Sequence, residues 1–593
     1  MSANVKALDR QKSDAEVIKK VLQSPGIKLD GVEIAYAPEM GGRGIYVRKD
    51  VPHVEKGTRI LTITPENILT ETIARESETG KKLLQKLVKD GEAPGDVISA
   101  PLAITCYLIS ETMQNRKRVR EAKEPLQNDY ESSAESNGEN SAGGREIHSK
   151  WNPMVHLYPT VDQFGTLPIF WTKEEKGWLQ GSSMESTTKK RLKRLRDEYR
   201  QVRFLWENPK ISLKKFLGIR LSVGSRCFGV TLNHSCPSQS ACMPIADMPN
   251  HSLKNSVGWT FDRDQNVFAM TSKRRLKSGE QVFISYGKKP NCDLLLHYGF
   301  CISNNPRDAV FVDAYIGFPI CRKRTVLLSR HGQQVPTATF TFLRMAFCIL
   351  TGRQERVRIG EGKGPRPLAA FLRRKVKKNK FGEEGSHDSD TESDTEKDRR
   401  KVRMATSWEK LSDDDVKRVP KSLDELMRMK DIEFKTLRCA PVSIENERMV
   451  LMTLSQACKR ALQRYPTTIE QDKKLRDELV EIPENEKCAR SGEDEETDSG
   501  KGKVLSLHEV RKLFALRLRI GEKRVLKWHI DLCDHVLGSF ESLQRESKSL
   551  KEGLTTGEHR TKASSFLKKS SAARTYMEKV VRNLVLREGR SKT

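Results

Sequence analysis

Three short motifs in the middle of the chain carry the side chains with the clearest chemistry. An Asn-His pair, Asn250 and His251, follows a short apolar run. A run typical of a β-strand ends in a Tyr-Gly pair at Tyr286, and a Tyr-Gly-Phe sequence begins at Tyr298. An Asn amide can hydrogen-bond the edge of a purine, and a phenol can accept a C–H contact and orient a nucleophile. The order and spacing of these motifs predict a methyl-transfer site that handles S-adenosylmethionine.

Methyl transfer from a sulfonium to nitrogen requires a neutral nitrogen held in line, about 3–3.5 Å from the methyl carbon. It requires no metal, and we predict none. Tyr286 is the candidate catalytic residue, because its hydroxyl can orient the attacking lone pair. An ordinary pKa of about 10 makes it a poor base at neutral pH. The alternative is a core tyrosine at the end of a strand.

A Gly-x-Gly sequence near the N-terminus is the other candidate for ligand contact. Gly42 and Gly44 leave the backbone free to approach a ligand closely, and Arg43 lies between them. A plain hairpin turn has the same signature, so this motif is weak without the others.

The bulk composition predicts several domains and an acidic partner. The chain has 593 residues, of which 36% are hydrophobic and 31% are charged. This length exceeds what one core supports, and the charge predicts solvated segments between domains. The net charge of +28 predicts attraction to acidic or nucleic-acid-associated partners, although no zinc-finger or basic-zipper spacing is present.

The cysteines and the apolar runs predict an intracellular protein. None of the twelve cysteines forms a Cys-x-x-Cys pair, and free thiols are typical of a reducing compartment. The first residues are polar, so no signal peptide is expected. No run is apolar for long enough to cross a bilayer, so we expect no membrane partner.

Strand, helix and low-complexity patterns divide the chain into eight segments. Strand-rich patterns cover residues 32–36, 45–47 and 59–63, and an apolar helical run covers 103–109. Thr172 and Glu175 are typical of a capped helix start. The predicted segments are a helical lead-in (1–30), a first strand-rich block (31–110), a disordered insert (111–150), a helical insertion (151–220), a second strand-rich block (221–312), the start of a helical region (313–352), a charged insert (353–415) and a helical region (416–593).

The charged insert combines basic and acidic tracts. Residues 373–378 and 399–403 are basic, which suits a two-part nuclear import signal, a nucleic-acid patch or a solvated loop. Ser and Thr residues between 389 and 395 lie among acids, so phosphorylation there would oppose the basic tracts.

Taken together, these motifs resemble the SET-domain methyltransferases, and more narrowly the subfamily of the Rubisco large-subunit methyltransferase and the actin-histidine methyltransferase. The resemblance covers most of the chain. It rests on residues 42–44, 168–181, 225–226, 246–251, 284–287 and 298–300, and on tail segments 464–470 and 519–523. The tail segments speak against the histone-type SET enzymes. The resemblance implies an α+β fold, with a SET-type β fold, an inserted helical subdomain and an all-α C-terminal substrate-binding domain.

The resemblance also implies a role for each candidate residue. Gly42, Arg43, Gly44, Asn250 and His251 are expected to bind S-adenosyl-L-methionine, the last two at its adenine end. Tyr298 is expected to wall the methyl channel and Phe300 to pack on the adenine, although both could be core residues. Ser225, Arg226 and Asp247 are expected to hold the substrate or the cofactor carboxylate, and a structural Arg–Asp pair is the alternative.

A second Asn-His pair, Asn233 and His234, competes with Asn250 and His251 for this role. It precedes Ser235 and Cys236 and matches the string of the histone-type SET domains. The context of Asn250 and its distance from Arg226 fit the subfamily better.

These features predict an S-adenosylmethionine-dependent protein N-methyltransferase. Lysine is the expected target, because Cys227 and Phe228 replace polar residues that would seat an imidazole and because Tyr298 is large. The alternatives are a histidine methyltransferase and a non-catalytic scaffold that binds acidic partners such as chromatin or ribosomes. We expect a monomer in the cytoplasm or the nucleus, with a protein substrate that the sequence does not name.

Overall fold

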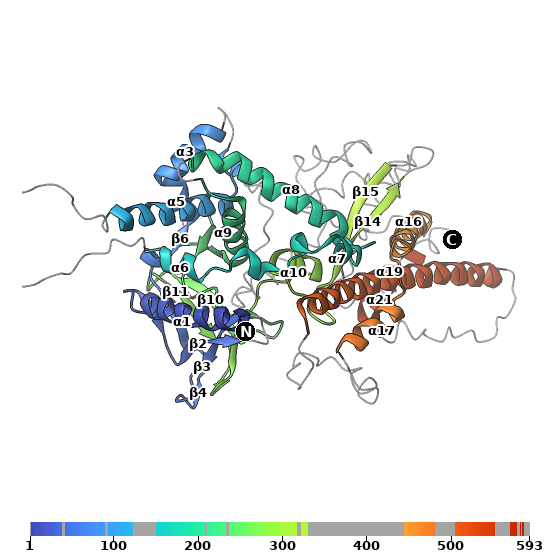
Figure 1. Cartoon of the computed structure of the whole chain (residues 1–593). Coiled ribbons are helices and arrows are strands. Elements are labelled where there is room, and N and C mark those ends of the chain that lie inside the picture. The colour runs from blue at the N-terminus through green and yellow to red at the C-terminus, as the bar shows by residue number, and fades with distance from the viewer. Residues whose placement is uncertain are drawn as a thin grey trace, which may run out of the picture. The chain divides into compact units, whose positions relative to one another are not determined.

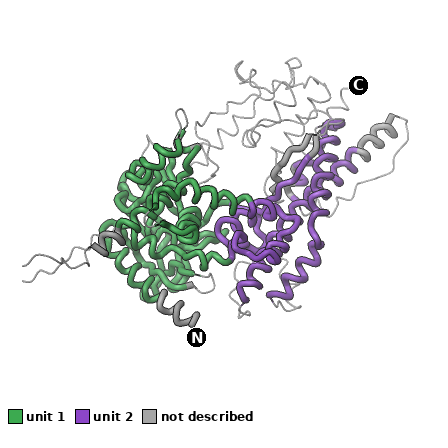
Figure 2. Tube along the Cα trace, turned by 45° about the horizontal axis from the view of Figure 1, so that its top comes forward, with its two compact units in different colours: residues 1–165, 190–288, 385–387 green, residues 166–189, 289–384, 388–593 purple. Residues whose placement is uncertain are grey.

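The chain of the computed structural model divides into two units, which Figure 2 shows in green and purple. Unit 1 contains residues 1–165, 190–288 and 385–387, and unit 2 contains residues 166–189, 289–384 and 388–593. The structure describes residues 2–37, 42–88, 93–121, 150–207, 210–232, 237–316, 322–329, 444–480, 505–551, 570–577, 581–582 and 584–585.

Unit 1 is built on short strands that come from both ends of its sequence (Figure 1). Two four-stranded sheets have the orders β1-β5-β11-β10 and β2-β3-β13-β9, beside a three-stranded sheet β6-β8-β7 and a ribbon β12-β4. The strands are β1 Ile27–Leu29, β2 Val32–Ala37, β3 Gly42–Val47, β4 His53–Val54, β5 Arg59–Ile63, β6 Leu69–Thr70, β7 Phe228–Val230, β8 Gln239–Cys242, β9 Asn250–His251, β10 Val257–Asp262, β11 Val267–Ser272, β12 Leu276–Lys277 and β13 Gln281–Ile284.

Alternating apolar residues determine which face of each strand is buried. In β3, Ile45 and Val47 are fully buried on one face of the strand. Gly44 and Tyr46, which alternate with them, belong to the opposite face. Residues of β5, β11 and β13 join the same hydrophobic core. The strands predicted over residues 32–36, 45–47 and 59–63 are confirmed as β2, β3 and β5.

Helices surround these sheets in unit 1. The apolar run at 103–109 is confirmed as part of a helix, α5, which packs against α9. The helices are α1 Ser2–Leu22, α2 Glu71–Glu76, α3 Glu78–Leu87, α4 Pro94–Val97, α5 Ala100–Glu121, α6 Asn152–Leu157 and α9 Leu213–Arg226, while α8 Met184–Val202 begins in the residue range of unit 2 and continues in that of unit 1.

Unit 2 combines a strand hairpin with long helices. Its elements are α7 Lys173–Gly177, α10 Asn291–Tyr298, β14 Ala309–Ile316, β15 Arg322–Ser329, α16 Ile444–Leu462, α17 Ile469–Val480, α19 Leu507–Lys551 and α21 Ser571–Tyr576. Val310 and Val312 of β14 share one core with α16, α19 and α21. The predicted cap of α7 is confirmed, because Thr172 and Glu175 exchange hydrogen bonds with each other's backbone.

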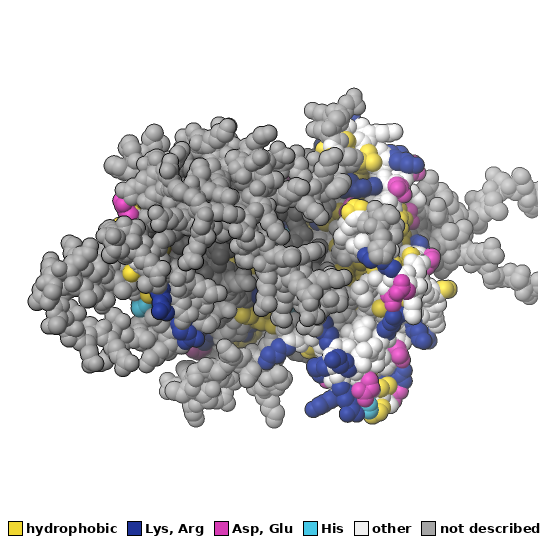
Figure 3. Space-filling view, turned by 180° about the vertical axis from the view of Figure 1, so that it is seen from behind, with side chains coloured by type: hydrophobic (Ala, Val, Ile, Leu, Met, Phe, Trp, Pro, Cys, Tyr) yellow, Lys and Arg dark blue, Asp and Glu magenta, His cyan; other side chains and the backbone are white. Residues whose placement is uncertain are grey.

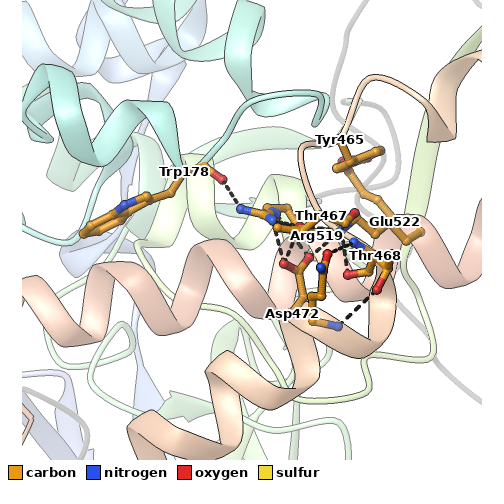
Figure 4. A network of polar contacts seen from close by, with 9 residues as sticks. Trp178, Tyr465, Thr467, Thr468, Asp472, Arg519 and Glu522 are labelled. Atoms are coloured by element: carbon orange, nitrogen blue, oxygen red, sulfur yellow. Dashed lines mark hydrogen bonds and ion pairs between the residues drawn. The ribbon is translucent and has the colours of Figure 1, made fainter.

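A network of buried polar side chains joins α17 to α19 within unit 2 (Figure 4). Asp472 accepts hydrogen bonds from Arg519 and, at 2.6 Å, from Lys523 Nζ, and the side chains of Asp472 and Lys523 are fully buried. Glu522, the residue before Lys523 in α19, accepts a hydrogen bond of 2.6 Å from the Tyr465 hydroxyl. Every charge in this network has an ionic or hydrogen-bonding partner, which is the condition for burying charge without a large cost.

Charged side chains of both signs cover the described part of the surface seen in Figure 3, where lysine and arginine lie among aspartate and glutamate. Several sequence predictions fall outside the described residues. These are most of the two inserts, most of the helical region expected to start at residues 313–352, the basic tracts and phosphorylation sites, and the Asn233–His234 pair.

Candidate active site

The sheet β2-β3-β13-β9 places three of the predicted motifs on adjacent strands. β3 begins with the Gly-x-Gly sequence. β13 pairs antiparallel with β3 and parallel with β9, and β9 consists only of Asn250 and His251. Tyr286 follows the end of β13 by two residues. Segments that are far apart in the sequence therefore meet at one edge of this sheet.

Gly44 lies where β3, β13 and β9 approach one another. A Cβ atom at this position would lie 2.6 Å from Nε2 of Gln281 and 3.4 Å from Nδ2 of Asn250. The first distance is too short for a non-bonded contact, so only glycine fits beside these amides without a shift. Gly42 differs, because a Cβ there would meet nothing within 4 Å. A Cβ atom at Gly44 therefore requires the end of the Gln281 side chain to shift, whereas one at Gly42 meets no described atom.

Asn250 links the Gly-x-Gly strand to β9. Its Nδ2 atom donates to the carbonyl of Arg43 over 3.3 Å. The Arg43 side chain serves a different purpose, because it donates to the Leu157 carbonyl and pairs with Asp14 at 3.2 Å. Arg43 thus contributes its backbone to the predicted site, while its guanidinium ties β3 to α1 and α6.

His251 holds Tyr286 in place. The Tyr286 amide donates to Nδ1 of His251 over 3.0 Å, and the two rings stack with centroids 5.1 Å apart. Since Nδ1 accepts this bond, a neutral ring carries its proton on Nε2. The imidazole is buried and positions the tyrosine, while the predicted contact of His251 with the cofactor stays a prediction.

The Tyr286 hydroxyl bonds to the backbone just before β9. It donates to the carbonyl of Pro249, the residue before Asn250, over 3.1 Å. Burial raises the pKa of Tyr286 to about 12, although the charge of Arg226 opposes this shift. The raised pKa favours the protonated phenol at neutral pH, which suits an orienting role better than that of a general base.

The predicted Arg–Asp pair forms beside this tyrosine. Arg226 Nη1 donates to Oδ2 of Asp247 over 2.8 Å and to its carbonyl over 3.2 Å. Burial disfavours the charge of Arg226, but Asp247 outweighs burial and raises the pKa of Arg226. Within the described structure, Nε of Arg226 and Oδ1 of Asp247 are buried without a hydrogen-bond partner. Both atoms remain able to bind a ligand.

Ser225 occupies the last turn of α9 next to Arg226. Its hydroxyl donates to the carbonyls of Leu221 and Ser222 over 3.0 and 3.2 Å. These bonds stay within its own helix, and the predicted contact of Ser225 with the substrate stays a prediction.

Two residues that the sequence did not single out, Tyr158 and Cys242, line the same region together with Cys227. Tyr158 is buried, which raises its pKa well above the ordinary value, and neighbouring Cys242 and Asp247 raise it further. The Sγ atom of Cys227, the residue just before β7, lies 3.3 Å from that of Cys242 at the end of β8. Tyr158 precedes the other residues by about seventy positions or more, and no local pattern marks it as their neighbour.

The backbone before Asp247 is strained. Ile245 has a φ of 70°, and the amide of Ala246 donates to the carbonyl of Pro244 over 2.8 Å. This tight turn is rare for a β-branched residue, because Cβ crowds the backbone at positive φ. Full burial of Ile245 holds it in place. Such strain is concentrated at functional sites, which agrees with the position of this turn.

Tyr298 and Phe300 belong to unit 2, whereas the residues above belong to unit 1. Tyr298 ends α10, in which Leu294, Leu295 and Leu296 are buried, and Gly299 follows with a φ of 80°. The two aromatic rings contact each other edge to face, with centroids 6.3 Å apart. Their predicted contact with the cofactor stays a prediction.

Within the described ranges, no three His, Cys, Asp or Glu side chains gather closely enough to hold a metal ion. No helix in this part of the chain has the length and apolar character needed to span a membrane.

The residues at the sheet edge fit the cofactor that the sequence predicts. Gln281 Nε2 is buried beside Gly44 and, among the described residues, has no hydrogen-bond partner. Together with Asp247 Oδ1 and Arg226 Nε, it offers donors and an acceptor to a polar ligand. S-adenosylmethionine carries a purine edge and a charged amino-acid end, so its chemistry matches this set.

Two protein families match the chain. Residues 42–287 match the SET domain, and residues 402–526 match the Rubisco LSMT substrate-binding domain. The first range contains β3, β13 and β9 of the sheet described above, while β2 precedes it. The second contains α16, α17 and the first part of α19.

Curated relatives and solved structures agree with these matches. Ribosomal lysine N-methyltransferase set10 of Schizosaccharomyces pombe is 29% identical over 168 residues, which cover 28% of this chain and 30% of the relative. The chloroplastic [fructose-bisphosphate aldolase]-lysine N-methyltransferase of Arabidopsis thaliana is 24% identical over 413 residues, or 64% of each chain. The chain thus spans less than two thirds of either relative.

A solved structure, the SET domain of LSMT bound to lysine and AdoHcy, matches with a TM-score of 0.53 and 18% identity. The match covers 92% of this chain and 97% of that chain. At this identity the likeness concerns the fold, and it confirms the predicted α+β architecture.

These findings define the class: the chain is a SET-domain protein. More narrowly, it combines this SET domain with a match to the Rubisco LSMT substrate-binding domain, as the sequence motifs predicted.

Proposed function

We propose that this protein transfers a methyl group from S-adenosylmethionine to the side-chain amine of lysine in a protein substrate. The observation that carries the proposal is the convergence of three motifs in unit 1. Asn250 bonds to the Gly-x-Gly strand, and Tyr286 bonds to the residue before Asn250. The two curated relatives described above are named lysine N-methyltransferases, which favours lysine over histidine.

The cofactor end of the site would be formed by β3 and β9. When bound, S-adenosylmethionine supplies a methyl group on a sulfonium sulfur. When an amine attacks the methyl carbon, the sulfur departs as a neutral thioether. The open space at Gly42 and the amides of Asn250 and Gln281 would receive its polar edges. Asp247 and Arg226 would hold a charged end of the cofactor or the substrate.

Tyr286 would orient the amine without removing its proton. Its pKa of about 12 keeps the hydroxyl protonated, and the bond to Pro249 fixes its direction. The attacking nitrogen must therefore lose its proton to water or be selected in its neutral form. His251 supports this arrangement by holding the Tyr286 amide.

We also propose an acidic or nucleic-acid-associated partner, a monomer, and a location in the cytoplasm or the nucleus. The net charge supports the first. The seven cysteines in the described ranges are free thiols, which supports a reducing compartment.

Calorimetric titration with S-adenosylmethionine, paired with transfer of a labelled methyl group to lysine-containing proteins of a cell extract, tests the proposal. We expect wild-type protein to bind and transfer. Asn250→Ala should abolish the heat of binding. Tyr286→Phe should bind normally but lose about 100-fold or more in transfer rate, because only the orienting hydroxyl is removed.

Asn67→Ala is the matched control, since Asn67 also donates its amide to a carbonyl, that of Pro25, in another part of unit 1. It should bind and transfer like wild type. Absence of any heat with correctly folded wild-type protein would favour the non-catalytic scaffold. Label on histidine rather than lysine would favour the histidine enzyme.

A further inference from the structure

Helix α8 presents a line of positive charge that the proposed methyl transfer does not use. Lys193, Arg196, Arg200 and Arg203 are all exposed, and they follow one another at intervals of three and four residues. This spacing places all four on one face of a helix. Arg203 continues the line into the short 3-10 helix Arg203–Leu205 that follows α8. We call these four residues the α8 stripe.

Few acidic groups neutralise the α8 stripe. Arg200 pairs with Asp197 over 2.7 Å, but Lys193, Arg196 and Arg203 form no ion pair with any described residue. The other acid within this part of the helix, Glu198, is nearly buried and binds Arg220 over 2.9 Å, on the opposite side from the stripe. The stripe spans roughly 15 Å at the rise of a helix. It is thus a row of mostly uncompensated cations on a rigid element.

The composition of the stripe favours a partner that carries negative charges at regular intervals along its length. Protein interfaces usually have an apolar centre rich in aromatic residues. None of the large apolar side chains that are exposed in the described structure lies on α8. No aromatic residue stands in the stripe, so it offers no platform for stacking the bases of a single strand. Nucleic-acid duplexes carry about one phosphate charge per 1.7 Å of axis and need no such contacts.

We propose that the α8 stripe binds the phosphate backbone of a nucleic-acid duplex without reading its sequence. This function is separate from the methyl-transfer site, because none of the four residues belongs to the sheet edge around Tyr286. Four phosphate contacts predict that log K falls against log salt with a slope of about −3 to −4 from the stripe alone.

The test is fluorescence anisotropy with a 20-base-pair DNA duplex, measured on the full-length protein at several salt concentrations. The variant carries Lys193→Gln, Arg196→Gln, Arg200→Gln and Arg203→Gln, since glutamine keeps helix propensity but removes the charge. We expect its affinity at 0.1 M salt to fall at least 10-fold and its salt slope to decrease by about 3 to 4. Duplexes of different sequence should bind equally to the wild-type protein.

A matched control removes four exposed lysines on the strands of unit 1 and their loops, by Lys28→Gln, Lys49→Gln, Lys56→Gln and Lys273→Gln. This control should change the slope by less than one. An equal loss in both variants would overturn the proposal in favour of diffuse charge. Stronger competition by polyglutamate than by duplex at equal charge would overturn it in favour of an acidic protein, and no duplex binding would also reject it.

If the fourfold variant misfolds, the double variant Lys193→Gln/Arg196→Gln provides the same test. Its slope should decrease by about 2, and an unchanged slope would reject the stripe. Cofactor calorimetry on both variants should match wild type, so failure of this proposal can be told apart from failure of the proposed methyl transfer.

Discussion

At the scale of single residues, the site depends on close contacts between side-chain amides and glycine. Gly44 leaves room for Gln281 and Asn250, and Asn250 in turn holds the Arg43 carbonyl. A side chain at Gly44 would displace one of these amides. The neighbouring Gly42 meets no such constraint, although both glycines look alike in the sequence.

We therefore expect Gly44→Ala to lower stability by about 1–3 kcal/mol, the usual cost of overpacking, and to weaken cofactor binding. Gly42→Ala should leave the stability of the cofactor-free protein within about 0.5 kcal/mol. Chemical unfolding and calorimetry measure the two effects.

Gln281→Ala provides the control for this prediction, because it removes the atom that the new Cβ would meet at 2.6 Å. Adding Gly44→Ala to Gln281→Ala should then cost much less than adding it to wild type. Equal costs in both backgrounds would show that the contact with Gln281 does not determine the effect.

Part of this site could be predicted from the sequence, because Asn250, His251 and Tyr286 lie in recognisable strings. The Arg226–Asp247 pair was predicted with them and forms. Tyr158 and Gln281 were not predicted, since only tertiary pairing brings them to the site. The contacts of the Arg43 side chain were also not predicted, because its partners in α1 and α6 are brought to it by packing rather than by local sequence.

At the scale of elements, α19 is one helix of 45 residues that buries charge along part of its length. A helical region was predicted here from residue 416 onward, but its buried ions were not, because charged residues are usually expected at the surface. Burial raises the pKa of Glu522 to about 7, against the hydrogen bonds from Ser183 and Tyr465. The folded protein therefore binds a proton at Glu522 more tightly than the unfolded chain does.

This shift makes a prediction about pH. Because the folded pKa is above the ordinary value of 4.5, the stabilisation is fully present below pH 4.5 and is lost as pH rises through about 7. Relative to Glu522→Gln, which resembles the protonated acid, wild type should lose stability on the order of 3 kcal/mol between pH 5 and pH 8. Thermal unfolding of both proteins across this range measures the difference.

Glu174→Gln, an exposed carboxyl on α7, is the control and should follow the wild-type curve. Parallel curves for wild type and Glu522→Gln would mean that Glu522 is ionised in the folded protein throughout this range.

At the scale of the whole chain, unit 2 is assembled from segments far apart in the sequence. Glu175 of α7 is buried and binds Arg511 of α19, with Nη1 at 2.7 Å from Oε2. Burial works against ionisation of Glu175, but the bonds from Arg511 and the Thr172 amide outweigh it and lower its pKa. The predicted segment 151–220 is divided between the two units at Gly165 and Lys190, a division that local composition does not mark.

Arg511→Ala should therefore destabilise unit 2 by about 3 kcal/mol, since it removes the guanidinium from a buried carboxylate and leaves only the Thr172 amide and His508 beside it. Hydrogen exchange should rise in α7 and in the facing turns of α19. Lys527→Ala removes an exposed pair with Asp531 and should change stability by less than about 1 kcal/mol. A similar small effect for Arg511→Ala would contradict the importance of this ion pair.

The pairing of β3 with β13 has a consequence for synthesis of the protein. Tyr46 pairs with Gln281, so β3 lacks that neighbour until the ribosome has made most of the first half of the chain. At ordinary elongation rates this wait lasts roughly tens of seconds. The nascent chain therefore carries an uncovered strand edge during translation, which makes it a natural client for chaperones and ties its yield to the speed of elongation.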